Sequence, residues 1–308
     1  MNPTPITRIT TFNNNQIYIK REDLIPYSFG GNKARKAFNF FKEIDKGNFS
    51  YVVTYGSSSS NHCRVVANMA AMRKLKCIII SPSESSKPTY NSKMMDLFGA
   101  KTVTVPVNEV HEAIENTLNS LKENGENPYF IPGGGHGNLG TMAYIGCYKE
   151  IYNFENETET NFDYIFFASG TETTQAGLVV GKLLFAGSEN IIGISIARKN
   201  PRGKQIVSDS INEYIKSYNL NISDNKVSDS LIFDDSFTQN GYAKSNDDIK
   251  NTIANMLINH GIPLDSTYTA KAYLGMERYI LNHGLTNKNI LFIHTGGTPL
   301  FFDDLSNY

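Results

Sequence analysis

The chain has 308 residues, 40% of them hydrophobic, which is enough for a substantial core in one large or two ordinary domains. Lysine and arginine together number 29 and aspartate and glutamate number 30, so the net charge is −1. This balance argues against nucleic acid or an anionic membrane as a partner, because no excess of basic side chains is present to neutralise phosphates.

Apolar patterns typical of strands and of helices alternate along the whole chain. We expect strands within residues 17–24 and at 51–54, 77–80, 102–105, 129–131, 164–168, 191–197, 231–233 and 290–294. We expect helices at residues 34–44, 61–75, 90–98, 110–123, 139–152, 174–185, 204–218, 246–259 and 269–282. Such alternation predicts an α/β fold with mostly parallel, open sheets covered by helices on both faces. Ligands of such sheets bind beyond the carboxyl ends of the strands.

Two polar stretches, residues 45–50 and 153–161, interrupt this alternation and are interpreted as surface linkers. They predict a larger, cofactor-binding domain made of residues 1–47 and 156–308. A smaller α/β domain, residues 48–155, would be inserted into it, with a size in the usual range for domains.

The cysteines, the histidines and the lengths of the apolar runs bear on whether the protein has disulfides, a metal site or a membrane span. The three cysteines are widely spaced without a Cys-x-x-Cys pair, so we expect buried thiols in a reducing compartment. No two of the six histidines stand at metal-ligand spacing, so no metal site is expected. Residues 1–11 lack the pattern of a signal peptide, and no apolar run approaches the roughly 18 residues of a membrane span. We therefore expect a cytoplasmic protein.

Residues 28–36 (SFGGNKARK) join the first expected strand to the first expected helix. Two consecutive glycines allow a left-handed backbone or a close approach to a ligand. Asn32 suits the N-cap, which puts Lys33 in the first turn, where the helix dipole disfavours a cation and lowers the pKa of the amine. A neutral lysine amine can attack a carbonyl group. The alternative is an exposed lysine beside Arg35 and Lys36 on a solvated face.

Two further stretches at strand-to-helix junctions combine hydroxyl groups with free backbone N–H groups. Residues 57–62 (SSSSNH) and 170–177 (GTETTQAG) could each hold a carboxylate or a phosphate, although a simple serine-rich N-cap also explains the first. Neither ends in Gly-Lys-Ser/Thr, which argues against a nucleoside triphosphate. The charge of Glu172 would oppose a phosphate unless it points away or pairs with a cation.

Residues 135–140 (GHGNLG) have the Gly-x-Gly-x-x-Gly form of a dinucleotide fingerprint. The motif lies far from the first strand, and no acidic residue follows about 20 residues later to bind a ribose. We therefore expect a glycine loop that faces a substrate, with a nicotinamide enzyme as an alternative. His294 ends the last strand and is interpreted as structural. No Gly-x-Ser-x-Gly elbow is present, which argues against a serine hydrolase.

Five stretches, in their order and spacing, resemble one family: GGNKARK at 30–36, SSNH at 59–62, GTETTQAG at 170–177, LDSTYTAKA at 264–272 and FIHTGG at 292–297. The chain is similar over about residues 4 to 302 to the D-cysteine desulfhydrase and 1-aminocyclopropane-1-carboxylate deaminase family. The resemblance implies an enzyme that uses pyridoxal 5′-phosphate. It also implies the fold of the tryptophan synthase β subunit (fold type II) and a homodimer.

The resemblance also implies roles for individual residues. Lys33 would carry the cofactor as a Schiff base and shuttle the α-proton, and the nearby Ser60 would assist proton transfer. Asn61 would bond the 3′ oxygen of the cofactor. The turn of Ser60, Asn61 and His62 would hold the substrate carboxylate. The cofactor phosphate would lie in the loop of Gly170, Thr171, Glu172, Thr173 and Thr174, and Tyr242 and Tyr268 would close over the substrate.

Thr269 and Thr295 stand where the family places the partners of the cofactor ring, and they match the desulfhydrase branch. A neutral hydroxyl leaves the ring nitrogen largely unprotonated, which makes the ring a weaker electron sink than a carboxylate partner would. The resemblance thus favours α,β-elimination from a small amino acid, giving a 2-oxo acid and ammonia. A cyclopropane ring-opening deaminase or another specialised lyase is the alternative within the family. A non-catalytic ligand-binding protein on the same fold is the alternative outside it.

Overall fold

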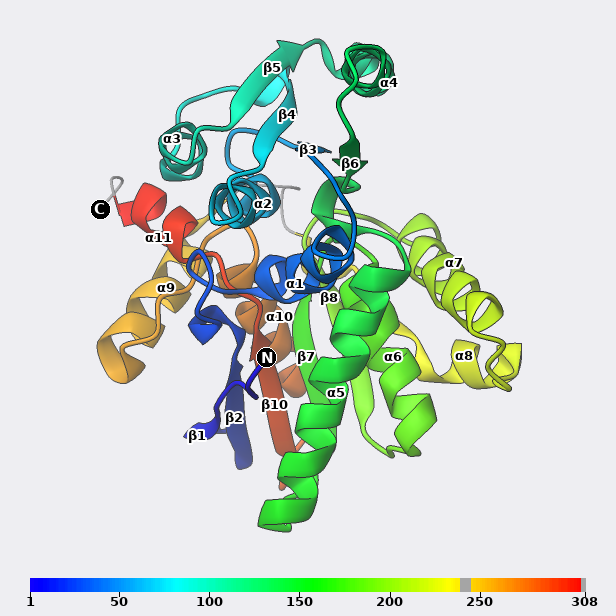
Figure 1. The fold of residues 1–308 in the computed structure, drawn as a ribbon. Coiled ribbons are helices and arrows are strands. Elements are labelled where there is room, and N and C mark those ends of the chain that lie inside the picture. The colour runs from blue at the N-terminus through cyan, green and yellow to red at the C-terminus, as the bar shows by residue number, and fades with distance from the viewer. Residues whose placement is uncertain (239–244, 306–308) are drawn as a thin grey trace.

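The strands form two separate sheets, which lie one above the other in Figure 1. The computed structural model describes residues 1–238 and 245–305. The larger sheet has the strand order β1 (Ile6–Phe12), β2 (Asn15–Arg21), β10 (Asn289–His294), β7 (Tyr164–Ser169), β8 (Asn190–Ser195) and β9 (Ile232–Asp234). β1 runs antiparallel to β2, and every other neighbouring pair is parallel. The expectation of mostly parallel sheets is confirmed.

The smaller sheet has four parallel strands in the order β5 (Lys101–Val105), β4 (Lys76–Pro82), β3 (Tyr51–Tyr55) and β6 (Pro128–Phe130). One face packs against α1 (Asn32–Ile44), α2 (Asn61–Ala71) and α3 (Tyr90–Leu97), with Val52 and Ile79 at the centre of that core. The other face packs against α4 (Val110–Glu123) through Ile78, Ile80 and Ile114.

Helices also cover both faces of the larger sheet. Side chains that alternate along the buried strands point to opposite faces, so Phe166 and Phe167 belong to two different cores. The first core is completed by α9 (Asp247–His260) and α10 (Thr269–Asn282). The second is completed by α5 (Asn138–Thr158), α6 (Thr173–Phe185), α7 (Arg202–Ser217) and α8 (Asp224–Ser230).

Several elements differ from the sequence expectation. The stretch expected as a linker after residue 152 continues α5 to Thr158, because Tyr152 and Phe154 pack against the second core of the larger sheet. β1 was not expected, since a register shift between Arg8 and Thr10 breaks the alternation that marks a strand. α8 and the last helix, α11 (Thr298–Leu305), were also missed. The division into two domains at residues 47/48 and 155/156 stays a prediction.

The described residues bear on two further expectations. Cys63, Cys77 and Cys147 are buried free thiols, as expected. Within residues 1–238 and 245–305, no helix combines the length and the apolar character that crossing a membrane requires.

Candidate active site

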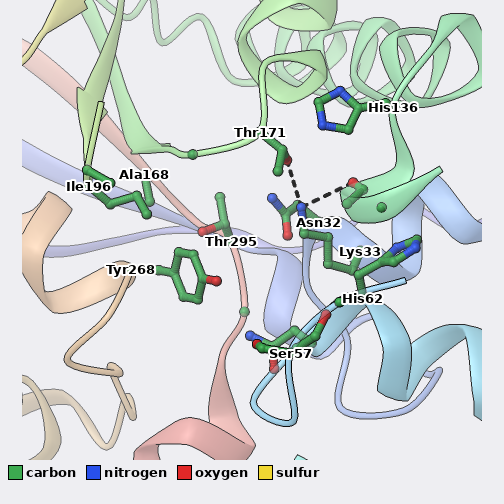
Figure 2. A pocket seen from close by; sticks show the side chains of 18 of the residues that line it. Asn32, Lys33, Ser57, His62, His136, Ala168, Thr171, Ile196, Tyr268 and Thr295 are labelled. Carbon is green, nitrogen blue, oxygen red and sulfur yellow. Dashed lines mark hydrogen bonds between the residues drawn. The ribbon is translucent and has the colours of Figure 1, made fainter. Parts of the chain in front are cut away.

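A cavity of about 510 Å³ lies where the carboxyl ends of strands from both sheets meet (Figure 2). Its volume falls within the roughly 300–1,000 Å³ typical of small-molecule sites. Tyr55 ends β3 and Ala168 lies in β7, while Ile196 and Thr295 directly follow β8 and β10. The other lining residues are Asn32, Lys33, Gly56, Ser57, Ser60, Asn61, His62, Gly133, Gly134, His136, Gly170, Thr171, Ala197, Arg198, Tyr268 and Gly296.

Lys33 enters this cavity from the first turn of α1, as the sequence predicts. Asn32 is the first residue of the helix rather than its N-cap, which is Gly31 at φ 89°. A Cβ atom at Gly31 would lie 2.7 Å from the backbone oxygen of Thr295, so only glycine fits there. The Asn32 amide instead donates to the Thr174 hydroxyl at 3.3 Å, which ties α1 to the start of α6.

The amine of Lys33 donates to the hydroxyl of Thr171 at 2.7 Å and to the carbonyl of Gly134 at 3.2 Å, as the dashed lines in Figure 2 show. Burial lowers the pKa of this amine to about 8, and the charge of Glu172 offsets only part of this lowering. The lowered pKa agrees in direction with the sequence expectation, and burial is a cause that the sequence did not indicate. A lysine with this pKa is partly neutral near physiological pH and so can act as a nucleophile or a base.

The serine-rich turn lies across the cavity from Thr171. Ser60 is the N-cap of α2, and its hydroxyl accepts from the backbone N–H of Cys63 at 3.2 Å. The Asn61 side-chain oxygen accepts from Arg64 at 2.6 Å and from the Asn91 amide at 3.1 Å, so its orientation is fixed. The start of a helix with a polar, fixed rim suits a carboxylate.

His62 also lines the cavity, but its ring is held by the core. The Thr54 hydroxyl donates its proton to the carbonyl of Ile131 at 2.7 Å, so at 2.9 Å it accepts from Nε2–H of His62. Burial, together with the charges of Lys33 and Lys36, lowers the pKa of the ring well below its usual value. His62 is therefore neutral, and its ring brings no positive charge to a bound carboxylate.

Gly170 and Thr171 line the cavity, whereas Thr173 and Thr174 begin α6 behind it. The Thr173 hydroxyl donates to the carbonyl of Gly135 at 3.3 Å, which joins this loop to the glycine run after β6. A Cβ atom at Gly134 would come within 2.7 Å of the Thr171 side chain. The backbone of Gly134 thus packs directly against the side chain of Thr171.

The sequence left open how the negative charge of Glu172 could be compatible with a phosphate in the same loop, and the structure shows where that carboxylate points. Its buried carboxylate turns to two nitrogen-bearing side chains, with His136 Nδ1 at 2.8 Å and the guanidinium Nη2 of Arg198 at 3.3 Å. Burial alone would raise the pKa of Glu172, but His136 and Arg198 outweigh it and lower the pKa. Arg198 also donates to the carbonyl of Gly170. Glu172 is thus paired with His136 and with the cation of Arg198, and both of these partners line the cavity.

Lys36 is a candidate that the sequence interpretation missed. Its side chain is 0% exposed, its amine lies 3.5 Å from the Thr171 hydroxyl, and burial lowers its pKa well below the usual value. Arg35 is also buried, against Glu22 and Glu150, so the alternative of a solvated basic face is wrong. The signal lay in the spacing, since residues three apart share one face of a helix.

The residues expected at the far end of the cavity differ in their surroundings. Tyr268 points its hydroxyl into the cavity, and Thr295 lies beside it (Figure 2). Thr269 does not line the cavity but donates to the buried carboxylate of Asp265 at 2.8 Å. His294 is structural, because its Nε2 donates to the carbonyl of Pro263 at 2.8 Å. Tyr242 lies outside the described residues.

This set of residues fits a cofactor that carries both a carbonyl group and a phosphate. Lys33 offers an amine of lowered pKa for the carbonyl. The buried amine of Lys36, which a bound phosphate would favour in its charged form, and the first N–H groups of α6 lie around Thr171. Among residues 1–238 and 245–305, no cluster of three His, Cys, Asp or Glu side chains could hold a metal ion.

Comparison with known proteins gives the family. Residues 1–296 match the family model described as pyridoxal-phosphate dependent enzyme. The chain belongs to this family. It is 30% identical to a D-cysteine desulfhydrase of Yersinia enterocolitica, over 98% of this chain and 93% of that protein. It is 28% identical to a D-cysteine desulfhydrase of Serratia proteamaculans, over 96% of this chain and 91% of that protein.

Solved structures confirm the fold of this family member. A crystal structure of an ACC deaminase homologue matches 100% of this chain and 94% of that one, with a TM-score of 0.87 and 27% identity. A hydrogen sulfide-producing enzyme from Fusobacterium nucleatum has a TM-score of 0.66 at 16% identity over 96% of this chain and 95% of that one, which bears on the fold alone. The protein is a pyridoxal phosphate-dependent lyase of fold type II, with elimination or deamination as its chemistry.

Proposed function

We propose that this pyridoxal phosphate-dependent enzyme catalyses α,β-elimination from a small amino acid such as D-cysteine, giving a 2-oxo acid, ammonia and the leaving group. The observation that carries the proposal is the convergence of the Lys33 amine, the Ser60–Asn61 turn and the Tyr268 hydroxyl on one cavity. Similarity to two D-cysteine desulfhydrases over nearly the whole chain supports this substrate class.

Lys33 would bind the cofactor covalently through its amine and afterwards move the α-proton of the substrate. The bound cofactor supplies the electron sink that stabilises negative charge on the α-carbon. A lysine with a pKa of about 8 can both accept and return a proton near neutral pH. Ser60 lines the same cavity, and its hydroxyl would assist this transfer.

The N-termini of two α-helices would hold the two anionic groups, which are the cofactor phosphate and the substrate carboxylate. The cofactor phosphate would lie at the start of α6, against Gly170, Thr171, the backbone of Glu172 to Thr174, and the amine of Lys36. The substrate carboxylate would lie at the start of α2, against Ser60, Asn61 and the backbone N–H of His62. Because the His62 ring is neutral and bonded to Thr54, its backbone rather than its ring would take part.

Thr295 and Tyr268 would complete the site. The Thr295 hydroxyl would face the nitrogen of the cofactor ring without charging it, and a weaker electron sink favours prompt loss of a β-substituent. Thr269 would act indirectly, because its hydroxyl donates to Asp265 behind the cavity wall. Tyr268, with Tyr242, would close over the substrate. We also propose that the protein works as a homodimer in the cytoplasm, and light scattering after gel filtration tests the oligomeric state.

The test is a substrate panel on the purified holoenzyme with D-cysteine, L-cysteine, D-serine and 1-aminocyclopropane-1-carboxylate. Sulfide and 2-oxo acid released from D-cysteine in equal amounts are the expected result. Preferential turnover of the cyclopropane substrate would favour the ring-opening deaminase, in line with the structural likeness to an ACC deaminase homologue. A holoenzyme that turns over none of the four would refute the proposal. Borohydride reduction should fix the cofactor on the peptide containing Lys33.

A further inference from the structure

α11 follows the cavity wall at Thr295 and Gly296 and carries two consecutive carboxylates, Asp303 and Asp304, which we call the Asp303–Asp304 clasp. In Figure 1 this helix lies beside α3, and the two are in contact. The clasp has no part in the function proposed above, since neither residue lines the cavity. Its two carboxylates nevertheless bond to Tyr90 and Ser266, which belong to two segments that hold different walls of that cavity.

Asp304 holds the turn that presents Tyr268. Its two carboxylate oxygens accept from the backbone N–H and the hydroxyl of Ser266, each at 2.8 Å. The neighbouring Asp265 accepts from the backbone N–H of Thr267 at 3.0 Å and of Tyr268 at 2.8 Å. These two carboxylates therefore hold the turn that positions Tyr268.

Asp303 holds the other wall through α3. Its carboxylate accepts from the backbone N–H of Tyr90 at 3.0 Å, one of the N–H groups that a helix start leaves without a partner. On either side of Tyr90, the Thr89 hydroxyl donates to the carbonyl of Ser58 at 2.7 Å, and the Asn91 amide donates to that of Ser59 at 2.7 Å.

Asn91 carries the connection to the cavity. Its amide also donates to the side-chain oxygen of Asn61 at 3.1 Å, and its own oxygen accepts from Arg64 at 2.8 Å. Asn91 and Arg64 are both 0% exposed, so water does not compete for these bonds. The first turn of α3 therefore fixes the Ser58–Asn61 segment, and Asp303 helps to hold that first turn together with the capping box of Thr89 and Ser92.

We propose that the Asp303–Asp304 clasp sets the distance between the carboxylate-binding turn and Tyr268, so that both walls meet the substrate together. The two aspartates are positioning residues, since they touch neither cofactor nor substrate. Adjacent positions on one helix give the two walls a common anchor, and a shift of α3 is passed to the Tyr268 turn through α11. The reference to substrate rests on the proposed function, whereas the linkage between the walls does not.

Hydrogen–deuterium exchange on the substrate-free holoenzyme tests the linkage. Asp303→Ala removes the bond to Tyr90, yet we expect faster exchange in the 265–269 turn, which Asp304 holds. Asp304→Ala should likewise speed exchange in residues 57–61 and 89–91. Leu305→Ala, on the exposed side of the same helix, is the matched control and should leave both segments unchanged. If each aspartate variant affects only the wall that it contacts, the clasp does not exist.

Conservative variants and steady-state kinetics give a second test of the Asp303–Asp304 clasp. An amide at either position still accepts the backbone N–H bond, and in Asp304→Asn it can also donate to the Ser266 hydroxyl, so both asparagine variants should behave as wild type. With D-cysteine, each alanine variant should raise KM by roughly tenfold, the scale expected for losing a hydrogen bond to a charged group. Cofactor affinity should not change. An unchanged KM in the alanine variants would overturn the positioning role. If the wild type does not turn over D-cysteine, the proposed function has failed and exchange alone decides the clasp.

Discussion

The amine nitrogen of Lys33 lies 2.7 Å from the hydroxyl oxygen of Thr171, although 138 positions separate the two residues in the chain. The contact joins the first turn of α1, which packs on the smaller sheet, to the loop between β7 and α6 of the larger sheet. The group that binds the cofactor carbonyl and the loop proposed for its phosphate are thus set against each other by the fold. Two testable consequences for cofactor binding follow from the buried lysines at this contact.

The pKa of Lys33 predicts how cofactor capture depends on pH. Because burial lowers this pKa to about 8, the neutral amine becomes the major form as the pH rises through 8. We expect the rate at which the cofactor-free protein takes up pyridoxal 5′-phosphate to rise between pH 7 and 9, with a midpoint near 8. Absorbance measures the rate, and a free lysine derivative under the same conditions corrects for the titration of the cofactor itself. A midpoint near 10.5 would show that Lys33 is solvated.

Lys36→Met tests the buried amine beside Thr171. Methionine keeps the length of the side chain and removes the group that a bound phosphate would hold in its charged form, so the affinity for pyridoxal 5′-phosphate should fall by about tenfold or more, as expected when a charge-assisted contact is lost. Affinity for pyridoxal, which lacks the phosphate, should be unchanged. Lys42→Met, on the exposed side of the same helix, is the control. Equal losses with both ligands would mean that Lys36 stabilises the fold rather than the phosphate.

Glu172→Gln tests the ion pairs behind the loop. The folded state holds the pKa of Glu172 below its unfolded value of 4.5, so the ionised carboxylate stabilises the protein above that pH and the contribution is lost as the pH falls through the lowered pKa. Since the His136 and Arg198 side chains are partly exposed, we expect a loss of only about 1 kcal/mol in the free energy of unfolding at pH 7. The difference from wild type should shrink towards pH 4.

Urea denaturation at the two pH values measures this difference. Glu115→Gln breaks a comparable His–Glu pair whose two side chains are largely exposed, and it should cost less than about 0.5 kcal/mol. A loss at Glu172 that stays constant between pH 7 and pH 4 would contradict the ionic explanation. It would point instead to the packing of the loop.

The sequence was sufficient for what local pattern and motif encode. The alternation of strands and helices and the glycine-assisted turn before Lys33 depend on neighbouring residues, and the structure has them where they were expected. The serine-rich N-cap, an alternative explanation of residues 57–62, is found at Ser60. Burial and long-range partners could not be predicted in this way. Nothing near Lys36 in the chain indicates that α5 and the Gly170 loop cover it, so it resembled a solvated lysine.

Distant partners explain the remaining differences. Glu172 is paired with residues 36 positions before it and 26 positions after it, and no local pattern could announce that pairing. α11 was missed because its eight residues show little periodicity. Its hydrogen-bond partners Tyr90 and Ser266 lie far away in the chain. In each case the chemistry of the side chain was visible in the sequence and its partner was not.

The last prediction separates the two threonines that the sequence grouped as partners of the cofactor ring. Thr295 lines the cavity, whereas Thr269 is 0% exposed and donates to Asp265, whose pKa burial raises to about 6 while the bond to Thr269 opposes that rise. Thr269→Val leaves a buried carboxylate short of a donor and should lower the free energy of unfolding by about 1–3 kcal/mol. Thr295→Val should instead shift the absorbance of the bound cofactor and change turnover, with a smaller effect on stability. Urea denaturation and absorbance spectra of both holoenzymes measure the two effects. The reverse outcome, a spectral shift in Thr269→Val at unchanged stability, would assign the ring contact to Thr269 and leave Thr295 as a lining residue.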